Sequence, residues 1–211
     1  MLHLDLILRA TSRHGALRAT ATIGQGATLL TGPSGAGKST LLALVAGAIL
    51  PQSGRLTWRD EHWSDGSRLL VPSHLRGIGW QPQAPSLHPG WTVRDHLDAT
   101  YRFRQQSPDL EARIIERLGL GPLMARRAGQ LSAGEAQRVA LLRALVACRG
   151  LLLLDEPVTA LPPDLARRAV ELIASLTEEQ GWTAIVVSHQ PLDGLLPTAH
   201  LELAEGLLRT P

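Results

Sequence analysis

Apolar and polar positions alternate along the first third of the chain. From Leu2 to Leu8, leucines at every second position are separated mainly by polar residues, which is typical of a strand with one buried face. The same pattern argues against a secretion signal at the N-terminus. Further short segments between turn residues predict strands at Ala16–Ile23, Ala27–Leu30, Gly54–Trp58 and Ile78–Gln81, with a hairpin edge over Trp58–Ser67.

Over residues 85–149 the pattern becomes helical. Three residues favoured as helix N-caps mark the expected starts, namely Thr92, Ser107 and Ser132. Asp95 stands three positions after Thr92, as in a capping box. We therefore expect three helices in this segment.

The last third alternates between strands and a helix. Leu151–Leu154 is an uninterrupted apolar run, typical of a strand buried on both faces of a parallel sheet. Ala184–Val187 predicts a second buried strand, and Pro163–Glu179 predicts a helix between the two. Leu201–Leu203 and Leu207–Leu208 predict a final hairpin. The pattern as a whole favours an α/β core interrupted by a helical insert.

Composition narrows the classes of function. The chain has 211 residues, 44% hydrophobic and 19% charged, as expected for a globular domain. A net charge of +2 and only 3% aromatic residues make nucleic acid an unfavoured partner. Cys148 is the only cysteine, so no intramolecular disulfide can form, and we expect a buried thiol in a reducing compartment. The longest apolar stretch, Leu41–Leu50, is too short to cross a bilayer.

Residues 32–39 read G-P-S-G-A-G-K-S, the spacing of a phosphate-binding loop. Its glycines let backbone N–H groups approach an anion, Lys38 supplies a cation, and the Ser39 hydroxyl is a magnesium ligand. A glycine-rich turn before an ordinary helix is the alternative. The strand expected at Ala27–Leu30 and the helix expected at Lys38–Leu50 favour nucleoside triphosphate binding.

Polar residues follow two other expected strands. Asp155 and Glu156 come after the leucine run, and Ser188 and His189 come after the next buried strand. Ligands bind beyond the carboxyl ends of parallel strands, so these side chains should meet the phosphate loop. Asp155 would hold magnesium, Glu156 would polarise an attacking water, and His189 would contact the γ-phosphate. Each pair could instead simply cap a helix or end a strand.

These motifs together resemble the ATP-binding cassette of ABC transporters over nearly the whole chain. Gly32–Thr40 matches Walker A, and Leu151–Glu156 matches Walker B with its catalytic glutamate. Leu131–Glu135 is similar to the family signature, and His189 matches the switch histidine. Gln83 matches the Q-loop glutamine.

Gln81 is the less favoured candidate for the Q-loop. The spacing to Leu87, Pro89 and Thr92 fits the family when it is counted from Gln83.

The resemblance implies a fold and a set of site residues. The fold is α/β, a P-loop NTPase (RecA-like) core with an N-terminal antiparallel β subdomain and an inserted α-helical subdomain. Residues 1–211 would form one ABC ATPase domain, with the core at 1–84 and 150–211 and the helical subdomain at about 85–149. ATP would be bound by Gly32, Pro33, Ser34, Gly35, Ala36, Gly37, Lys38, Ser39, Thr40 and Asp155. Catalytic roles would fall to Lys38, Gln83, Glu156 and His189, and Mg²⁺ would be held by Ser39, Gln83 and Asp155.

The resemblance also implies a second cassette. Two copies would close head to tail on two ATP molecules, with the signature of one facing the γ-phosphate bound by the other. That signature consists of Leu131, Ser132, Ala133, Gly134 and Glu135. Its Ser132 would begin a helix with free N–H groups, although a self-satisfied capping box is an alternative interpretation.

Several positions depart from the family pattern. Glu135 replaces glutamine and places a negative charge near a phosphate, so we hypothesise that it weakens ATP-driven closure. Ala133 replaces a glycine, and Pro162 replaces the aspartate of the loop after Walker B, which puts coupling between the sites in doubt. The aromatic residue that stacks on adenine is missing. Arg13 or His14 occupies that region, which suggests loose base selectivity.

The type of cassette is indicated by the short helical insert and by residues 71–79, which resemble molybdate-type and thiamine-type importer ATPases. The chain ends soon after Leu208, so we expect no C-terminal regulatory domain. The resemblance implies permease partners, a second cassette (a homodimer), an extracytoplasmic solute-binding protein, and a place on the cytoplasmic face of the membrane. A permease helix would dock in a groove beside the Q-loop, lined by Pro85, Leu87, His88, Pro89 and Trp91. Trp91 is either an anchor for that helix or ordinary packing.

Two alternative functions stay open at this point. One is a soluble ABC-type ATP switch that serves DNA or translation, and the other is a degenerate cassette that binds ATP with little hydrolysis. Ala133 and Pro162 suggest the second alternative. Turnover would separate a degenerate cassette from a transport ATPase, and co-purifying partners would separate the transport ATPase from a soluble switch.

Overall fold

The computed structural model describes residues 1–8, 16–100, 107–190 and 192–210. These residues form one sheet of eleven strands in the order β6-β5-β4-β1-β2-β11-β10-β3-β9-β8-β7. The strands are β1 Leu2–Leu8, β2 Leu17–Ile23, β3 Gly26–Thr31, β4 Ser53–Trp58, β5 Glu61–Asp65, β6 Arg68–Leu69, β7 Ile78–Gln81, β8 Leu151–Asp155, β9 Thr183–Val187, β10 Ala199–Ala204 and β11 Leu207–Arg209.

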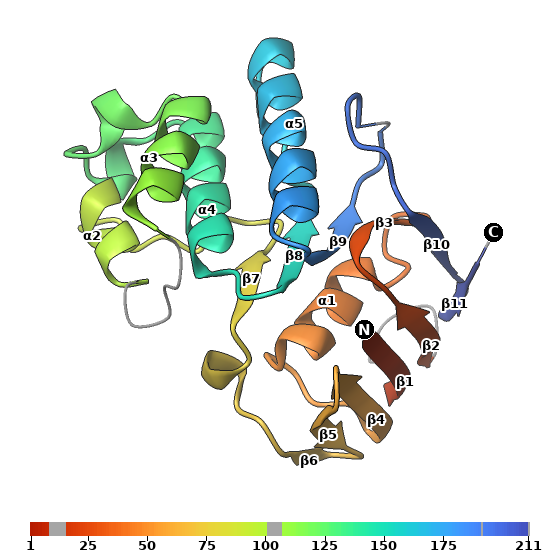
Figure 1. Ribbon diagram of the computed structural model, residues 1–211. Helices are drawn as coiled ribbons and strands as arrows, with labels where there is room; N and C mark the ends of the chain where they lie inside the picture. The colour runs from red at the N-terminus through yellow and green to blue at the C-terminus, as the bar shows by residue number, and fades with distance from the viewer. Residues whose placement is uncertain (9–15, 101–106, 191, 211) are drawn as a thin grey trace.

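The sheet has a parallel part and an antiparallel part (Figure 1). Strands β10, β3, β9, β8 and β7 pair parallel to one another. Strand β1 pairs antiparallel with β2 and with β4, and β5 and β6 extend that edge. The predicted combination of an α/β core with an N-terminal antiparallel β portion is confirmed.

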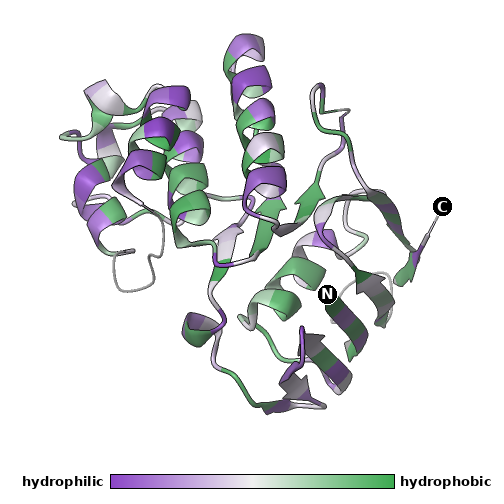
Figure 2. Cartoon of the chain, viewed as in Figure 1, coloured by the Kyte–Doolittle hydropathy of each residue, from purple (hydrophilic) through white to green (hydrophobic). Residues whose placement is uncertain are grey.

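Helices cover both faces of the parallel strands. Helix α1 (Lys38–Ala46) lies on one face, and α4 (Ala133–Ala147) and α5 (Pro163–Glu179) lie on the other (Figure 1). On β8, Leu151 and Leu153 join the core cluster of α1, whereas Leu152 and Leu154 join the cluster of α4 and α5. Figure 2 shows β8 as hydrophobic along its length. The unbroken apolar run of the sequence therefore reflects burial on both faces.

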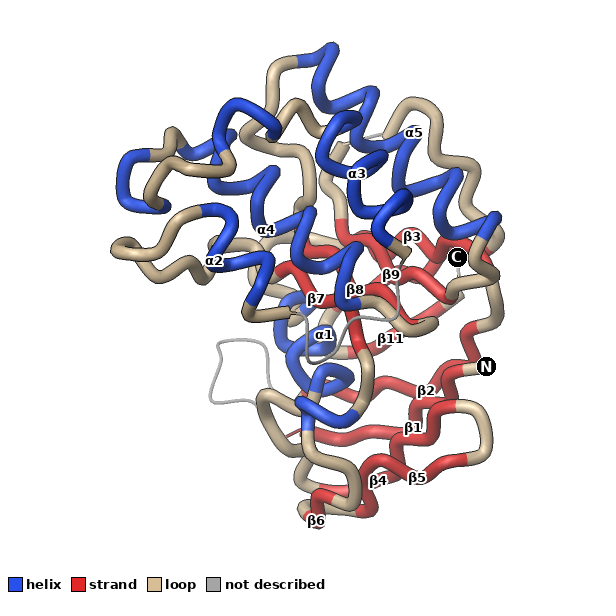
Figure 3. The backbone as a smooth tube through the Cα atoms, turned by 60° about the vertical axis from the view of Figure 1, so that its left-hand side comes forward, coloured by secondary structure: helices blue, strands red, loops and turns tan. Residues whose placement is uncertain are grey.

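The helical segment lies between β7 and β8 in the sequence. It contains α2 (Val93–Asp98), α3 (Pro108–Arg117), the 3₁₀ turns Gly121–Leu123 and Ala128–Gln130, and α4. Thr92, Ser107 and Ser132 cap α2, α3 and α4, and the capping box of Thr92 with Asp95 is present. Figure 3 shows this segment at the opposite end of the molecule from β4, β5 and β6.

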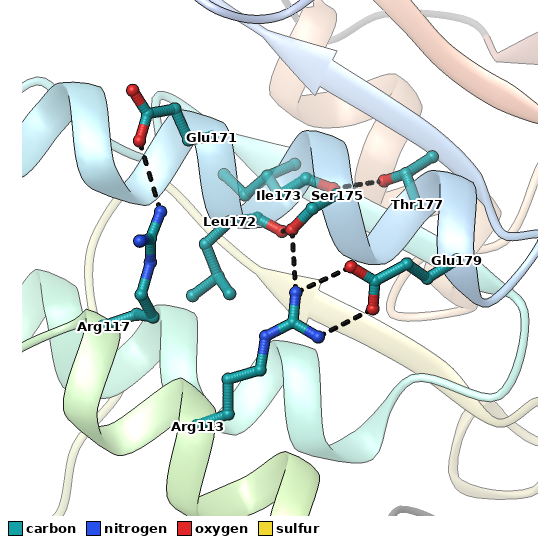
Figure 4. A network of polar contacts seen from close by, with 8 residues as sticks. All are labelled: Arg113, Arg117, Glu171, Leu172, Ile173, Ser175, Thr177 and Glu179. Atoms are coloured by element: carbon teal, nitrogen blue, oxygen red, sulfur yellow. Dashed lines mark hydrogen bonds and ion pairs between the residues drawn. The ribbon is translucent and has the colours of Figure 1, made fainter.

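Ion pairs join α3 to α5 (Figure 4). Both guanidinium nitrogens of Arg113 lie 2.7 Å from the Glu179 carboxylate oxygens, and one of them also donates to the Ser175 hydroxyl at 3.2 Å. Arg117 lies 3.2 Å from Glu171. The helical segment is thus tied to a helix of the core at two points.

The structure also corrects one predicted boundary. The helix expected at Lys38–Leu50 ends at Ala46, because Gly47 adopts a left-handed conformation (φ 76°) and its N–H bonds back to the last turn. Ile49 and Leu50 are exposed beyond it.

No helix within the described ranges is long and apolar enough to cross a membrane. Cys148 is buried as predicted, and burial raises its pKa to about 12.

Candidate active site

The phosphate loop joins β3 to α1, and its glycines adopt conformations that other residues disfavour. Gly37 precedes the helix with φ 103°, and Gly32 has φ 139°. A Cβ at Gly32 would collide with the carbonyl group of Leu203 on β10. The loop can therefore curl tightly only because glycine occupies these positions.

Lys38 lies at the start of α1 and is only 6% exposed. Its ammonium group donates to the carbonyl oxygens of Gly32 and Pro33 at 2.7 and 3.0 Å. Burial lowers the pKa of Lys38, while the nearby carboxylates of Glu156 and Asp155 act in the opposite direction. The cation thus sits at the loop, facing the acidic pair that follows β8.

A cavity of about 340 Å³ lies at the carboxyl edge of the parallel strands. Four separate parts of the chain meet there: the phosphate loop, the Q-loop region, the end of β8 and the end of β9. The cavity is lined by Ser34, Gly35, Gly37, Lys38, Ser39, Thr40, Gln83, Asp155, Glu156, Val187 and His189. The cavity lining therefore contains most of the motif residues that the sequence placed at this edge, but not Gly32, Pro33, Ala36 or Ser188.

Glu156 has an unusual backbone conformation. It is a non-glycine residue with φ 51°, a conformation that costs on the order of 1 kcal/mol or more. One of its carboxylate oxygens accepts a hydrogen bond from the Thr159 hydroxyl at 2.8 Å. The other lies 3.5 Å from Nε2 of His189. Only the Thr159 side of the carboxylate is hydrogen-bonded, and the oxygen near His189 has no hydrogen-bond partner among the described residues.

Gln83, rather than Gln81, reaches the cavity. Gln83 is exposed after β7 and lines both this cavity and a neighbouring one of about 390 Å³. Gln81 is buried within β7, and its side-chain amide has no hydrogen-bond partner among the described residues. The geometry agrees with the choice made from spacing.

The residues of the signature segment, Leu131–Glu135, do not line the cavity. Ser132 and Glu135 form the capping box of α4: the Ser132 N–H donates to the Glu135 carboxylate at 2.7 Å, and the Glu135 N–H donates to the Ser132 hydroxyl at 3.3 Å. Arg126 lies 3.2 Å from the same carboxylate. The Ser132 N–H, with help from the Ser132 hydroxyl and Arg126, lowers the pKa of Glu135.

Two further residues at the site, Gln137 just after the signature segment and Thr159 in the loop after Walker B, were given no role from the sequence. Gln137 of α4 is buried and bonds both ends of the turn that follows β8, at Glu156 and Ala160. Thr159 bonds the Glu156 carboxylate. The sequence did carry one indication for Gln137. It is a polar residue at helical spacing from Ala140 and Ala144, on the face of α4 that is buried.

The donor chemistry of the cavity fits a magnesium ion. Ser39, Gln83 and Asp155 line it with hydroxyl, amide and carboxylate oxygens, which are the ligand types that Mg²⁺ takes together with phosphates and water. Asp155 is buried at the end of β8.

Comparison with known proteins identifies the family. The sequence model described as ABC transporter matches residues 18–159, about two thirds of the chain. The chain belongs to the ABC transporter family.

Curated relatives of this cassette are import proteins by name. It is 42% identical to the molybdenum import ATP-binding protein ModC of Thiobacillus denitrificans, over 80% of this chain and 47% of that protein. It is 38% identical to the thiamine import ATP-binding protein ThiQ of Cereibacter sphaeroides, over 92% of this chain and 83% of that protein. The cassette spans about half the length of the ModC relatives it matches.

Solved structures agree on the fold. A dimeric structure of a bacterial ABC transporter cassette superposes with a TM-score of 0.82 at 24% identity, covering 100% of this chain and 98% of the other. A nucleotide-free ATP-binding cassette of an ABC transporter gives a TM-score of 0.73 at 22% identity, covering 99% and 89%. The expected P-loop NTPase fold is confirmed.

The departures of this cassette from its family occupy defined places. Pro162 is the N-cap of α5 and makes no side-chain capping bond, unlike an aspartate at that position. Ala133 is the first residue of α4 and is exposed. Arg13 and His14, expected near the adenine, lie outside the described residues.

The groove beside the Q-loop differs from the expected one. A groove of about 330 Å³ is lined by Ile78, Trp80, Pro82, Ser86, Ala99, Thr100, Ala140, Arg143, Ala144 and Ala147. None of the five residues expected to line it (Pro85, Leu87, His88, Pro89 and Trp91) does so. Leu87 instead packs against the core cluster. Trp91 is 43% exposed and contacts the rings of His88 and His96.

Proposed function

We propose that this cassette binds and hydrolyses ATP and thereby energises an ABC transporter that imports a small solute. The observation that carries this proposal is the 340 Å³ cavity, where the phosphate loop meets Asp155, Glu156 and His189. A cation, an anion-binding loop and a constrained carboxylate at one sheet edge are what phosphoryl transfer to water requires.

The residues divide the work of ATP hydrolysis to ADP and phosphate. Loop N–H groups and Lys38 would hold the phosphates and stabilise charge on them. Mg²⁺, held by Ser39, Gln83 and Asp155, would supply neutralisation of phosphate charge. Glu156 would accept the proton of the attacking water, and His189 would align the γ-phosphate.

A second copy of the chain would complete each site. The signature residues 131–135 lie away from the cavity of their own chain, so they are available to face the nucleotide of a partner. The N–H groups of Ala133 and Gly134 at the start of α4, which the capping box does not use, suit an anion. We infer a homodimer, each copy one ABC ATPase domain with its core at 1–84 and 150–211 and its helical subdomain at about 85–149.

The import role is supported by the relatives. Proteins named for molybdenum, thiamine and Fe(3+) ion import are 36–42% identical to this chain. By analogy the cassette would work on the cytoplasmic face of the membrane, bound to permease subunits and served by an extracytoplasmic solute-binding protein.

Turnover and co-purification test the proposal. Purified chain should release phosphate from Mg·ATP, and Glu156→Gln should lower turnover about 100-fold or more, because the general base is lost. Tagged protein drawn from detergent-extracted membranes should bring a multispanning membrane protein with it.

Other outcomes decide against the proposal. Turnover that is already at background in the wild-type chain would favour a degenerate cassette, as Ala133 and Pro162 suggest. Ribosomes or nucleic acid as the recovered partners would favour a soluble ATP switch.

A further inference from the structure

Gln137 links α4, the helix that begins in the signature segment, to the turn after β8. That turn carries Glu156, the proposed general base. The side chain of Gln137 is buried and uses both ends of its amide. Nε2 donates to the carbonyl oxygen of Glu156 at 2.6 Å, and Oε1 accepts from the N–H of Ala160 at 2.9 Å. One side chain of α4 thus fastens the first and the last residue of the turn 156–160.

The carbonyl that Gln137 holds belongs to a strained residue. Glu156 has φ 51°, and such conformations persist only where the surroundings fix them. The Glu156 N–H donates to the Val187 carbonyl oxygen at 3.1 Å, so β9 fixes one side of the residue and Gln137 fixes the other. Because the direction of the Cα–Cβ bond depends on the backbone, these two contacts also set where the carboxylate points.

The turn after β8 packs closely against α4 and carries further hydrogen bonds. A Cβ at Gly134 would lie 2.7 Å from the Ala160 carbonyl oxygen, so α4 and the turn are in direct backbone contact. Within the turn, the Leu161 N–H donates to the Val158 carbonyl oxygen at 3.0 Å, and the Thr159 hydroxyl donates to the Glu156 carboxylate at 2.8 Å. Removal of the Gln137 amide would leave a buried carbonyl group without this donor, and the turn would shift to satisfy it.

We propose that Gln137 is a positioning residue for water activation, acting through the backbone of Glu156. Its amide holds the Glu156 peptide in the left-handed conformation that aims the carboxylate into the 340 Å³ cavity. This inference rests on the role proposed above for Glu156. Because Gln137 belongs to α4, its hydrogen bonds also couple the start of α4 to the Glu156 carboxylate of the same chain.

The first test replaces Gln137 with methionine, which has a similar length and lacks both hydrogen-bonding groups. Turnover (kcat) of the purified chain should fall about 10- to 100-fold, the cost of a misplaced catalytic group. The KM for ATP and the affinity for Mg·ATP should stay within about twofold, because Gln137 does not line the nucleotide cavity.

A second variant should give a pH dependence of turnover that general destabilisation of the fold would not produce. In Gln137→Glu the ionised carboxylate accepts from Ala160 but cannot donate to Glu156, whereas the protonated form can do both. Burial raises the pKa of the introduced carboxyl group, so its protonated form becomes more populated as the pH falls. The ratio of Gln137→Glu turnover to wild-type turnover should therefore rise from about pH 8 to about pH 6.

Two controls separate positioning from other roles. Arg138→Met removes a tether on the same helix, where Arg138 donates to the carbonyl oxygens of Leu118 and Gly119, away from the cavity. It should keep turnover within about twofold of wild type. In the Glu156→Gln background, Gln137→Met should leave ATP-dependent dimerisation unchanged.

The inference is overturned alone if Gln137→Met keeps full turnover while Glu156→Gln is inactive. It is also overturned if Gln137→Met loses dimerisation or ATP affinity as strongly as turnover. If Glu156→Gln is as active as wild type, the proposed function falls, and this inference falls with it.

Discussion

Glu135 sets the charge at the start of the signature helix. Its carboxylate occupies the Ser132 N–H and is only partly compensated by Arg126 at 3.2 Å. Its carboxylate is negative at neutral pH, as for any glutamate, and it lies where a partner's phosphate would approach. Glu135→Gln should therefore tighten ATP-dependent dimerisation of a Glu156→Gln chain about fivefold, the size of one screened charge pair. Sedimentation with and without ATP measures it.

Arg126 supplies the matched control for that charge. Arg126→Gln should weaken dimerisation while Glu135 is present, because the carboxylate loses its counter-charge. The same substitution should have little effect in the Glu135→Gln chain. This account of the signature would be contradicted if adding Glu135→Gln to the Glu156→Gln chain left ATP-dependent dimerisation equal or weaker.

At the scale of elements, α2 carries a buried histidine that links stability to pH. His96 is buried against Trp91, and its Nε2 lies 3.2 Å from the His88 carbonyl oxygen. Burial, followed by the charges of Arg143 and His88, lowers the pKa of His96, although the His88 carbonyl and Asp95 act in the opposite direction. His96 is therefore harder to protonate in the folded chain than in the unfolded chain, where it takes up a proton below about pH 6.5.

Neutral, buried His96 therefore adds to the free energy of unfolding at pH values above its pKa in the unfolded chain. This contribution is lost as the pH falls through that pKa toward the lower pKa of His96 in the folded chain. The urea midpoint of wild type should therefore fall more between about pH 7.5 and pH 5.5 than that of His96→Gln, whose side chain cannot titrate. The glutamine can still donate to the His88 carbonyl. Parallel pH profiles for the two proteins would show that His96 does not contribute.

Element identity was largely predictable, because it depends on local signals. The caps at Thr92, Ser107 and Ser132 and the apolar run of β8 each have a short-range cause, and all four were found where expected. The end of α1 was missed because the apolar pattern continues past Gly47, whose left-handed conformation stops the helix.

At the scale of the whole molecule, ion pairs fix the helical segment against the core (Figure 4). Arg113 of α3 bonds Glu179 of α5 through two contacts of 2.7 Å, and both side chains are about two-fifths exposed. Because solvent screens the pair, Arg113→Met should lower the free energy of unfolding by only about 0.5–1 kcal/mol.

A double-mutant cycle with Glu179→Gln should assign roughly 0.5 kcal/mol to the pair itself. That coupling should shrink in about 1 M salt. A coupling energy of zero at low salt would mean that the contact does not hold α3 to α5.

Long-range contacts account for most of what the sequence did not predict. The motif residues could be placed at one sheet edge because parallel strands bring their carboxyl ends together. Nothing local indicated that Arg113 meets Glu179, that Gly32 packs on Leu203, or that Gln137 reaches Glu156. Each contact joins segments whose separation depends on the complete fold.

The central claim is that a triphosphate is held between the phosphate loop and the acidic pair after β8. Calorimetric titration of the purified chain with Mg·ATP, for wild type and Lys38→Ala, tests it most directly. We expect clear binding by wild type and an affinity lowered about tenfold or more in Lys38→Ala, since a partly buried cation facing the phosphates is removed. Equal affinities for the two proteins would contradict the account.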